Sequence, residues 1–281
     1  MESVKKSTEI PLVLGGHSFI SQMGNDRKPS EDALVAIVDT CLDSGIRWFD
    51  TTYLPERRAL GKVLNTLGRR AEATIMAWNF FKDFGDEDDE GKPELYQAHH
   101  IDEMLEQLQT DWIDVLVIRP LEYTKRDRSQ EELMQNWLES KYVKRLGIWH
   151  PEPEAEDTYL ELNPFSAMVQ SYNVANRRAV PAFAMAKRLS WQTIACSPFI
   201  RGWKLDELVN RALDLEPGGQ KEAALRFKIA DLMLRFALFG ENVDRLIVAI
   251  RRLEWIVRNI ESCQRGKLTE QERFWLERLL T

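Results

Sequence analysis

Eight short apolar runs, separated by segments with a helical pattern, constrain the fold of this 281-residue chain more than any other feature. The runs cover residues 10–14, 47–49, 74–78, 112–118, 143–148, 167–170, 192–196 and 246–250. Strands that alternate with helices form parallel sheets, because a parallel pair needs a long crossover connection. Eight such units predict an α/β fold of the (β/α)8 TIM-barrel type, with a single domain over residues 1–281.

The segments between the runs carry helix signals. Ser30, followed by Glu31 and Asp32, is typical of a helix start, because the serine caps the helix and the acids favour its dipole. Thr269 and Glu272 have the spacing of a capping box, which predicts a last helix that starts there. An apolar stripe at helical spacing, expected to pack on the sheet, consists of Ile101, Met104, Leu105 and Leu108.

Two segments interrupt this alternation. Residues 82–93, KDFGDEDDEGKP, form an acidic loop after the third run, on the face where a barrel holds its active site. We expect this loop to be solvated, with a lid or a cation-binding loop as alternatives. Residues 201–220, after the seventh run, are predicted to be irregular because Pro217, Gly218 and Gly219 break the pattern.

Composition narrows the classes of function. The formal net charge of −7 argues against nucleic acid or an anionic membrane as the main partner and fits small molecules or proteins better, of which we expect a small-molecule substrate. No run of about 18 apolar residues occurs and the first residues lack a signal-peptide stretch, so a cytoplasmic protein is expected. The three cysteines are far apart without zinc-site spacing, which predicts free thiols. We expect no metal site, with a two-histidine, one-carboxylate set of His17, Asp50 and His150 as the alternative. The oligomeric state stays open.

The segment RWFDTTYLPERRALG, residues 47–61, contains the first candidate catalytic residues. Its apolar run ends in Asp50, two threonines and Tyr53, and a helical pattern begins within a few residues. Polar groups at the carboxyl end of a parallel strand lie where α/β barrels place their active sites. The segment therefore predicts an active site at the end of the second strand.

Five segments, in this order, resemble the aldo-keto reductase superfamily. They are GIRWFDTTYLPERRALGKVL, MLEQLQTDWIDVLVIRP, KYVKRLGIWH, MVQSYNVANR with ACSPFIRGW, and LIVAIRRLEWIVRNI. The resemblance covers nearly the whole chain and implies a (β/α)8 barrel that binds NADP(H) or NAD(H) in an extended pose without a Rossmann fold. It also implies that a hydride passes from nicotinamide to a carbonyl compound.

The family's catalytic set is a tyrosine that acts as general acid, a lysine and an aspartate that lower its pKa, and a histidine that orients the carbonyl. Asp50 matches the aspartate. The tyrosine position holds Pro55, so Tyr53 is the candidate acid, and the lysine position holds Trp78. The histidine position holds Arg119, a permanent cation that could polarise a carbonyl or neutralise Asp50. The chain thus resembles a divergent member that lacks the lysine and the histidine.

Five further residues match cofactor-binding positions of the family. Gln170 is retained on the sixth strand, and Ser197 with Arg201 resembles the loop beside the pyrophosphate. Arg251 and Asn259 fall in the segment that holds the adenosine 2′-phosphate and the adenine. An arginine there would give charge-assisted bonds to phosphate, and a helix N-terminus would add its dipole. The resemblance therefore implies that the phosphate half of the cofactor site is preserved.

The nicotinamide half departs from the family pattern. Trp149 and His150 follow the fifth strand where the family has a serine and an asparagine, and Cys196 replaces the tyrosine that stacks on the nicotinamide. Three functions are therefore compatible with the sequence. The first is NAD(P)H-dependent reduction of a small carbonyl compound. The others are non-redox acid-base chemistry, as in a lyase, isomerase or hydrolase, and a catalytically inactive binding or regulatory barrel.

Overall fold

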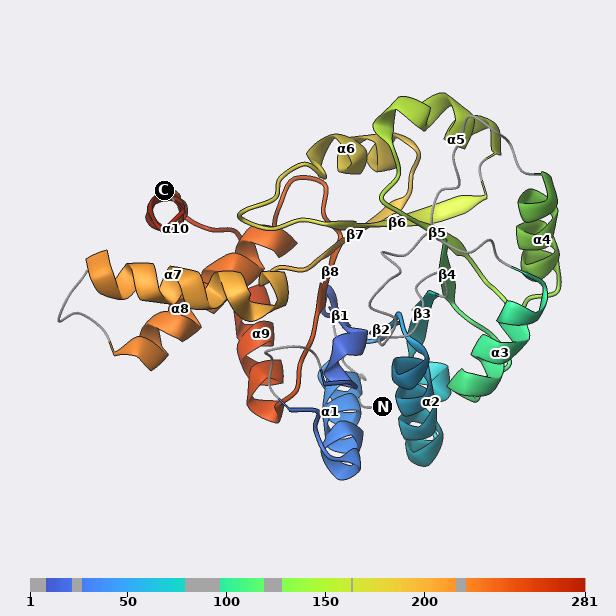
Figure 1. Cartoon of the computed structure of the whole chain (residues 1–281), viewed down its shortest axis with the longest axis horizontal. Coiled ribbons are helices and arrows are strands. Elements are labelled where there is room, and N and C mark those ends of the chain that lie inside the picture. Colours follow the sequence, from blue (N-terminus) through green and yellow to red (C-terminus); the bar gives the residue numbers. More distant parts are fainter. Residues whose placement is uncertain are drawn as a thin grey trace, which may run out of the picture.

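The chain forms a closed barrel of eight parallel strands with helices on its outside (Figure 1). The computed structural model describes residues 9–21, 27–78, 97–118, 128–162, 164–215 and 221–280. Each strand pairs with its neighbours in sequence, and β1 also pairs with β8, which closes the barrel. The strands are β1 Leu12–Leu14, β2 Trp48–Thr51, β3 Thr74–Trp78, β4 Val115–Ile118, β5 Leu146–Trp149, β6 Phe165–Ser171, β7 Gln192–Cys196 and β8 Arg245–Val248. The predicted (β/α)8 barrel is confirmed.

The predicted strands overlap the observed ones at all eight positions. β3 and β7 have the predicted bounds, whereas β4 begins at Val115 rather than at residue 112. The shortening has a local cause, because Ile113 pairs with Val143 only through an isolated bridge ahead of β4 and β5.

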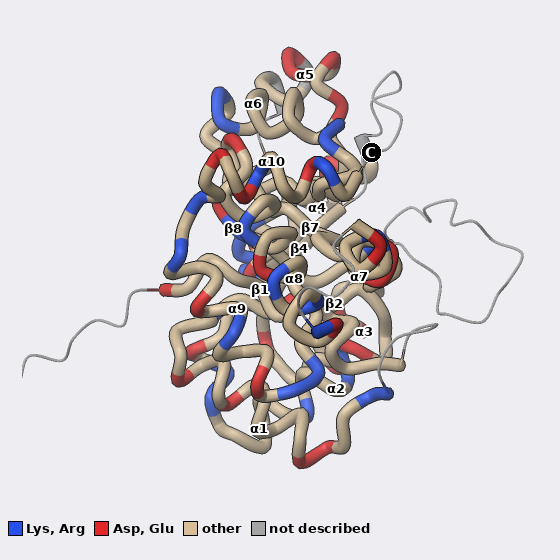
Figure 2. Tube along the Cα trace, turned by 90° about the vertical axis from the view of Figure 1, so that its left-hand side faces the viewer, with Lys and Arg blue, Asp and Glu red and all other residues tan. Residues whose placement is uncertain are grey.

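Helices cover the outer face of the barrel. They are α1 Glu31–Asp43, α2 Leu54–Leu67, α3 His99–Leu108, α4 Arg128–Glu139, α5 Glu156–Leu162, α6 Val180–Arg188, α7 Trp203–Leu215, α8 Glu222–Leu238, α9 Leu253–Arg265 and α10 Glu270–Arg278. In Figure 2, Lys and Arg alternate with Asp and Glu along these outer elements rather than gathering on one side of the view. None of the helices in the described ranges is long and apolar enough to cross a membrane.

The predicted helix starts are confirmed. The Ser30 side chain accepts a hydrogen bond from the backbone N–H of Ala33 at the start of α1, and Thr269 and Glu272 form the expected capping box of α10. In α3, Ile101, Met104 and Leu108 are buried and Leu105 is half-buried.

One expectation is wrong. Residues 203–215 form the regular helix α7 instead of an irregular segment. Their apolar positions, at the i, i+3, i+4 and i+7 spacing of a helix that packs on a sheet, are Leu205, Leu208, Val209 and Ala212. The three breakers at 217–219 lie outside the described residues, as does the acidic loop 82–93.

Trp48 shows which face of β2 points into the barrel. Its ring lies 5.1 Å from the guanidinium carbon of Arg145 and 4.4 Å from that of Arg245. Arg145 precedes β5 and Arg245 starts β8, and neither strand is a neighbour of β2. Because side chains two apart on a strand share a face, Asp50 also points inward, one step nearer the carboxyl end.

Candidate functional site

The connection between β2 and α2 consists only of Thr52 and Tyr53. Pro55 lies in the first turn of α2 and is exposed. The buried guanidinium of Arg57 holds this connection in place. It donates to the backbone oxygen of Thr52 at 2.9 Å and to that of Trp78, at the end of β3, at 2.6 Å.

Asp50 is a buried acid at the carboxyl end of β2, with an exposed fraction of 6%. Its Oδ1 accepts a hydrogen bond from the indole N–H of Trp78 at 2.6 Å, and its Oδ2 accepts a longer one from the backbone N–H of Gly16 at 3.4 Å. Burial raises the pKa of Asp50 to about 7, and the charge of Glu56 acts in the same direction. The two hydrogen bonds and His17 oppose this rise in the pKa.

Glu56 brings a second buried carboxyl group to the same place. Its side chain is fully buried although it belongs to the first turn of α2. Oε2 accepts hydrogen bonds from the backbone N–H groups of Thr52 at 2.6 Å and Tyr53 at 3.2 Å, and Oε1 lies 2.9 Å from Nδ1 of His17. The carboxyl group lies against Gly16, where an added Cβ would be 2.1 Å from Oε2. Any other residue at position 16 would therefore displace the Glu56 carboxyl group.

His17 is the member of this cluster that reaches solvent. It lies in the short helix η1, Gly16–Ser18, directly after β1, and a third of its side chain is exposed. Its ring lies parallel to that of Tyr53, with the two centroids 6.0 Å apart. Tyr53, at the N-terminus of α2, therefore contacts the candidate site by stacking on His17.

Two tryptophans lie across the mouth. Trp78, which ends β3, is 4% exposed and packs edge-to-face on Trp149, which ends β5, with the ring centroids 4.8 Å apart. Trp149 in turn contacts His150 at 4.1 Å, and His150 is exposed with a left-handed backbone φ of 46°. This aromatic layer joins the carboxyl ends of β3 and β5 across the intervening β4, and the Asp50 carboxyl group lies behind it.

Gln170 and Cys196 lie on the opposite side of the barrel. Gln170 is near the carboxyl end of β6, and its side-chain oxygen is buried with no hydrogen-bond partner among the described residues. Cys196 ends β7, and burial raises the pKa of its thiol to about 12, with the charge of Asp50 acting in the same direction. The charge that acts on Cys196 therefore comes from β2, on the other side of the barrel.

The ends of β7 and β8 hold the remaining described cofactor candidates. Ser197 follows β7 with a left-handed φ of 60° and is exposed. Arg251 is half-buried in the turn between β8 and α9, and the half-buried Asn259 lies within α9. Since β6, β7 and β8 are consecutive in the barrel, Gln170, Ser197 and Arg251 lie along one arc of its carboxyl edge.

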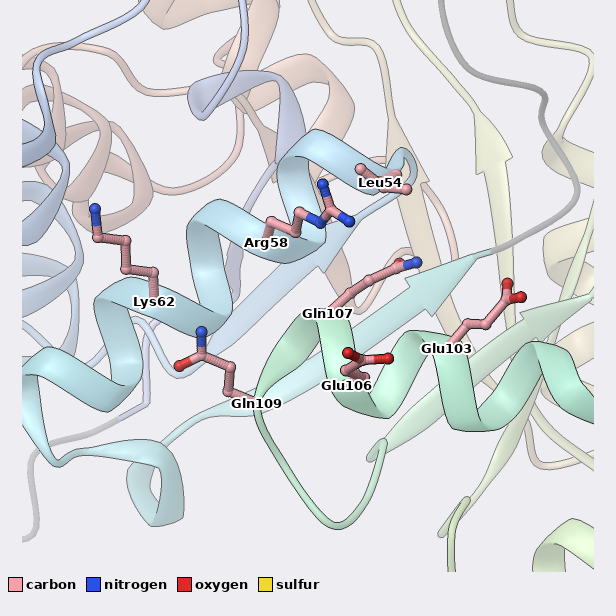
Figure 3. A pocket seen from close by; sticks show the side chains of 7 residues that line it. All are labelled: Leu54, Arg58, Lys62, Glu103, Glu106, Gln107 and Gln109. Atoms are coloured by element: carbon pink, nitrogen blue, oxygen red, sulfur yellow. The ribbon is translucent and has the colours of Figure 1, made fainter.

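A separate polar groove lies between α2 and α3 (Figure 3). It has a volume of 570 Å³ and contains none of the predicted site residues. Figure 3 shows that Arg58 and Lys62 line it from α2 and that Glu103 and Glu106 line it from α3. The ammonium group of Lys62 pairs with Glu31 of α1 at 2.7 Å. In the part of the chain that is described, no group of three or more His, Cys, Asp and Glu side chains could hold a metal ion.

A sequence model of the aldo/keto reductase family matches residues 11–279. The chain belongs to the aldo/keto reductase family. The structure is similar to that of an aldo-keto reductase from Bacillus halodurans in its holo form, with a TM-score of 0.71 and 19% sequence identity over 97% of this chain and 94% of that one. A search of curated protein sequences found no significant match.

The structure brings together only some of the residues expected from the family pattern. Glu56 and His17 link Asp50 with Tyr53, and the indole of Trp78 donates a hydrogen bond to Asp50. Arg119 lies outside the described residues, and so does the side chain of Arg201, whose backbone belongs to the short helix η4, Ile200–Gly202.

Glu56 and Gly16 are site residues that the sequence analysis missed. Glu56 is in the helical pattern of α2, where an acid is ordinarily solvated. Tyr53 at the N-cap is not the serine or threonine of a capping box, so the sequence carries no local signal for a buried Glu56.

Proposed function

We propose that this protein is an NAD(P)H-dependent oxidoreductase that reduces a small carbonyl compound at the carboxyl end of the barrel. The observation that carries the proposal is the buried, unpartnered side-chain oxygen of Gln170. A buried acceptor without a donor is costly, and the N–H₂ of a nicotinamide carboxamide is a donor of the right kind. Membership of the aldo/keto reductase family supports the same cofactor class.

Residues beyond Gln170 fit the rest of the cofactor. Arg251 is a half-buried cation beside the N-terminus of α9, where the helix dipole also favours an anion. Ser197 and Asn259 would contribute polar contacts from the adjoining loop and helix. When bound, the nicotinamide would supply a hydride. The protein's own part is to hold the cofactor along β6 to β8, to exclude water with Trp78 and Trp149, and to supply a proton.

The first experiment is a titration of the protein with NADPH and with NADH, followed by tryptophan fluorescence. Trp78 and Trp149 lie at the mouth, so saturable quenching is expected at micromolar to millimolar cofactor. Oxidation of NADPH in the presence of a panel of small aldehydes and ketones would then identify the reaction. Absence of binding at millimolar concentrations of both cofactors would contradict the proposal.

Arg251→Ala tests the phosphate side of the site. The loss of a charge-assisted contact to phosphate is expected to weaken NADPH binding about 10-fold or more and NADH binding much less. Arg265→Ala is the matched control, because Arg265 is a half-exposed cation at the other end of α9, paired with Asp231 at 3.0 Å. Equal effects of Arg251→Ala on both cofactors would refute a 2′-phosphate contact.

One observation favours a second candidate, a barrel that binds a nucleotide without turnover. Trp78 is buried against Trp149 and bonded to Asp50, so the two indoles take up space at the mouth. Binding of NADPH with no oxidation across the carbonyl panel would support this candidate. The non-redox alternative would be supported instead by turnover of a substrate without any nicotinamide cofactor.

A further inference from the structure

We propose that the amino end of the barrel binds a small oxyanion, of the size and charge of phosphate or sulfate, between the guanidinium groups of Arg145 and Arg245. Trp48 and Arg245 are the first residues of β2 and β8, and Arg145 directly precedes β5. The site therefore lies at the opposite end of the strands from the candidate active site. The inference goes beyond the proposed function and does not depend on it.

The two arginines converge on one indole ring. The guanidinium carbons of Arg145 and Arg245 lie 5.1 Å and 4.4 Å from the centre of the Trp48 ring, which points into the barrel. The three side chains come from β2, β8 and the start of β5, which are not neighbours in the sheet. The charge of Arg145 also acts on Arg245, as one of the causes that lower its pKa after burial. Two permanent cations are thus held close together.

Arg245 has hydrogen-bond donors that the protein leaves unused. Its side chain is only 13% exposed, and its Nη2 pairs with Oε1 of Glu9 at 2.8 Å. Its Nε and Nη1 are buried, and they have no hydrogen-bond partner in the described part of the chain. Unpaired donors on a buried cation are costly, so these two atoms point to an acceptor that binds there.

Arg145 supplies the second half of the site. It is half-buried, and burial lowers the pKa of its guanidinium group while the charge of Asp114 opposes this change. Over the described ranges, its guanidinium group makes no ion pair and no hydrogen bond, and its contact is with the Trp48 ring. An indole ring attracts a cation but offers no oxygen to its N–H groups. The donors of Arg145 are therefore also open to an acceptor.

The acids at this end of the barrel are already engaged. Asp114, just before β4, accepts two hydrogen bonds on each of its oxygens. Their donors are the side chains of Arg70, Lys144 and Trp112 and the backbone N–H of Ile75. Asp244, just before β8, is bonded to Lys187 and Thr193. Glu9 is 45% exposed and reaches Arg245 alone. Among the described residues, one partly exposed carboxylate is thus left to balance two guanidinium groups.

An oxyanion matches this arrangement in charge and in shape. Its negative charge would offset the repulsion between the two cations, and its oxygens would accept from both guanidinium forks. Chloride would supply charge without a set of oxygens in fixed directions. An ion held between the start of β5 and β8 would connect strands that share no hydrogen bonds. Because it would bind the folded chain alone, it is expected to stabilise the barrel.

Thermal unfolding in sodium phosphate at pH 7 tests this, with the ionic strength held constant by sodium chloride. The unfolding midpoint is expected to rise by about 3 °C at about 20 mM phosphate, as for a dissociation constant of about 1 mM. Sodium sulfate should act in the same direction. Isothermal titration calorimetry with phosphate should give a similar constant.

Charge-removing variants locate the site. Arg145→Met keeps an apolar stem against Trp48 and is expected to weaken phosphate binding about 10-fold or more. Arg245→Met should have the same effect, and Arg145→Met decides if the Arg245 variant does not fold. Lys144→Met is the matched control, because it removes the same charge one residue away from a lysine that already pairs with Asp114 at 2.9 Å. It should change phosphate binding by less than about 2-fold.

The same titration in Arg251→Ala separates this site from the cofactor site, where phosphate can also bind. A phosphate response that persists in Arg251→Ala and is lost in Arg145→Met would support the proposal. The reverse pattern would place the ion at the cofactor site and overturn it. A wild-type midpoint that is the same in phosphate, sulfate and chloride would also overturn it, because the two arginines would then be merely hydrated. The reductase proposal is decided separately, by the titration with NADPH and NADH.

Discussion

At the scale of single residues, Asp50 links the chemistry of the site to its stability. An acid whose pKa is raised on folding binds its proton more tightly in the folded than in the unfolded chain. The pKa of Asp50 rises from 3.8 to about 7. Its contribution to stability is therefore complete below about pH 4 and is lost as pH rises towards 7, because the folded protein must then bury a carboxylate.

Asp50→Asn should therefore change how stability depends on pH. Between pH 5 and 7 the free energy of unfolding of the wild type is expected to fall relative to that of the variant by about 2 kcal/mol, because the slope is about 1.4 kcal/mol per pH unit at pH 5 and halves near pH 7. Urea unfolding at four pH values measures this. Asp214→Asn is the matched control, because Asp214 is exposed on α7. Parallel curves for the wild type and Asp50→Asn would contradict the raised pKa.

Sequence reasoning found Asp50, but it could not find the partners of this residue. The position of an acid after an apolar strand is visible in the sequence, since it depends on neighbours along the chain. The burial of Glu56 and its approach to His17 depend on how α2 docks after a two-residue connection. Neither contact has a pattern in the sequence, because the two residues lie 39 positions apart.

At the scale of elements, Gly61 controls how closely α2 approaches α3. A Cβ added at Gly61 would lie 2.5 Å from the backbone carbon of Leu108 and 2.8 Å from the carbonyl oxygen of Gln107. These are backbone atoms that cannot rotate away. Because α2 also carries Glu56 and Arg57, its position on α3 helps to place the groups around Asp50.

Gly61→Ala is expected to destabilise the protein even though alanine is the better helix former. Helix propensity would contribute about 1 kcal/mol in favour of alanine, whereas the forced separation of two helices costs about 1–3 kcal/mol. A net loss of about 1 kcal/mol in urea unfolding is therefore expected. Asn65→Ala, at an exposed position of the same helix, should be neutral or stabilising. A stabilising Gly61→Ala would show that α2 can move away without cost.

Elements were predicted well where one local pattern decides them and poorly where two patterns compete. All eight strands and the starts of α1 and α10 followed from apolar runs and capping residues. The prediction for residues 203–215 was wrong because their apolar spacing is that of a helix, and the helix breakers at 217–219 follow only after it. The first residues of β4 and β5 depend on pairing across the sheet. Both strands therefore begin later than the predicted residues 112 and 143.

At the scale of the whole molecule, the C-terminal helix is fastened to the barrel by a buried ion pair. Arg235 on α8 is 4% exposed and contacts Oε1 of Glu272 on α10 at 2.8 Å. The hydrogen bonds of Arg235 lower the pKa of Glu272 to about 2. In Figure 1, α7, α8 and α10 lie together on one side of the barrel, so this pair holds the end of the chain against that layer.

Glu272→Gln should weaken this attachment in a pH-dependent way. A carboxyl group with a lowered pKa contributes stability above its unfolded pKa, near 4.5, and loses it as pH falls towards 2. At pH 7 the variant is expected to lose about 1–3 kcal/mol in the free energy of unfolding, and the difference from the wild type should shrink on acidification. Glu277→Gln breaks an exposed pair with Arg177 and should cost less than about 1 kcal/mol. Equal losses in the two variants would contradict the buried role of Arg235.

The two-residue connection after β2 also limits how this protein could change over evolutionary time. A tyrosine at position 55 would project from an exposed position of the first turn of α2, next to the buried Glu56. To bring that phenol towards Asp50, the chain would need a different path after β2. The step would require inserted residues between Thr51 and Leu54, and any longer connection would also disturb the backbone N–H groups that hold Glu56. The present acid cluster is therefore separated from a tyrosine-based site by an insertion and not by a point mutation.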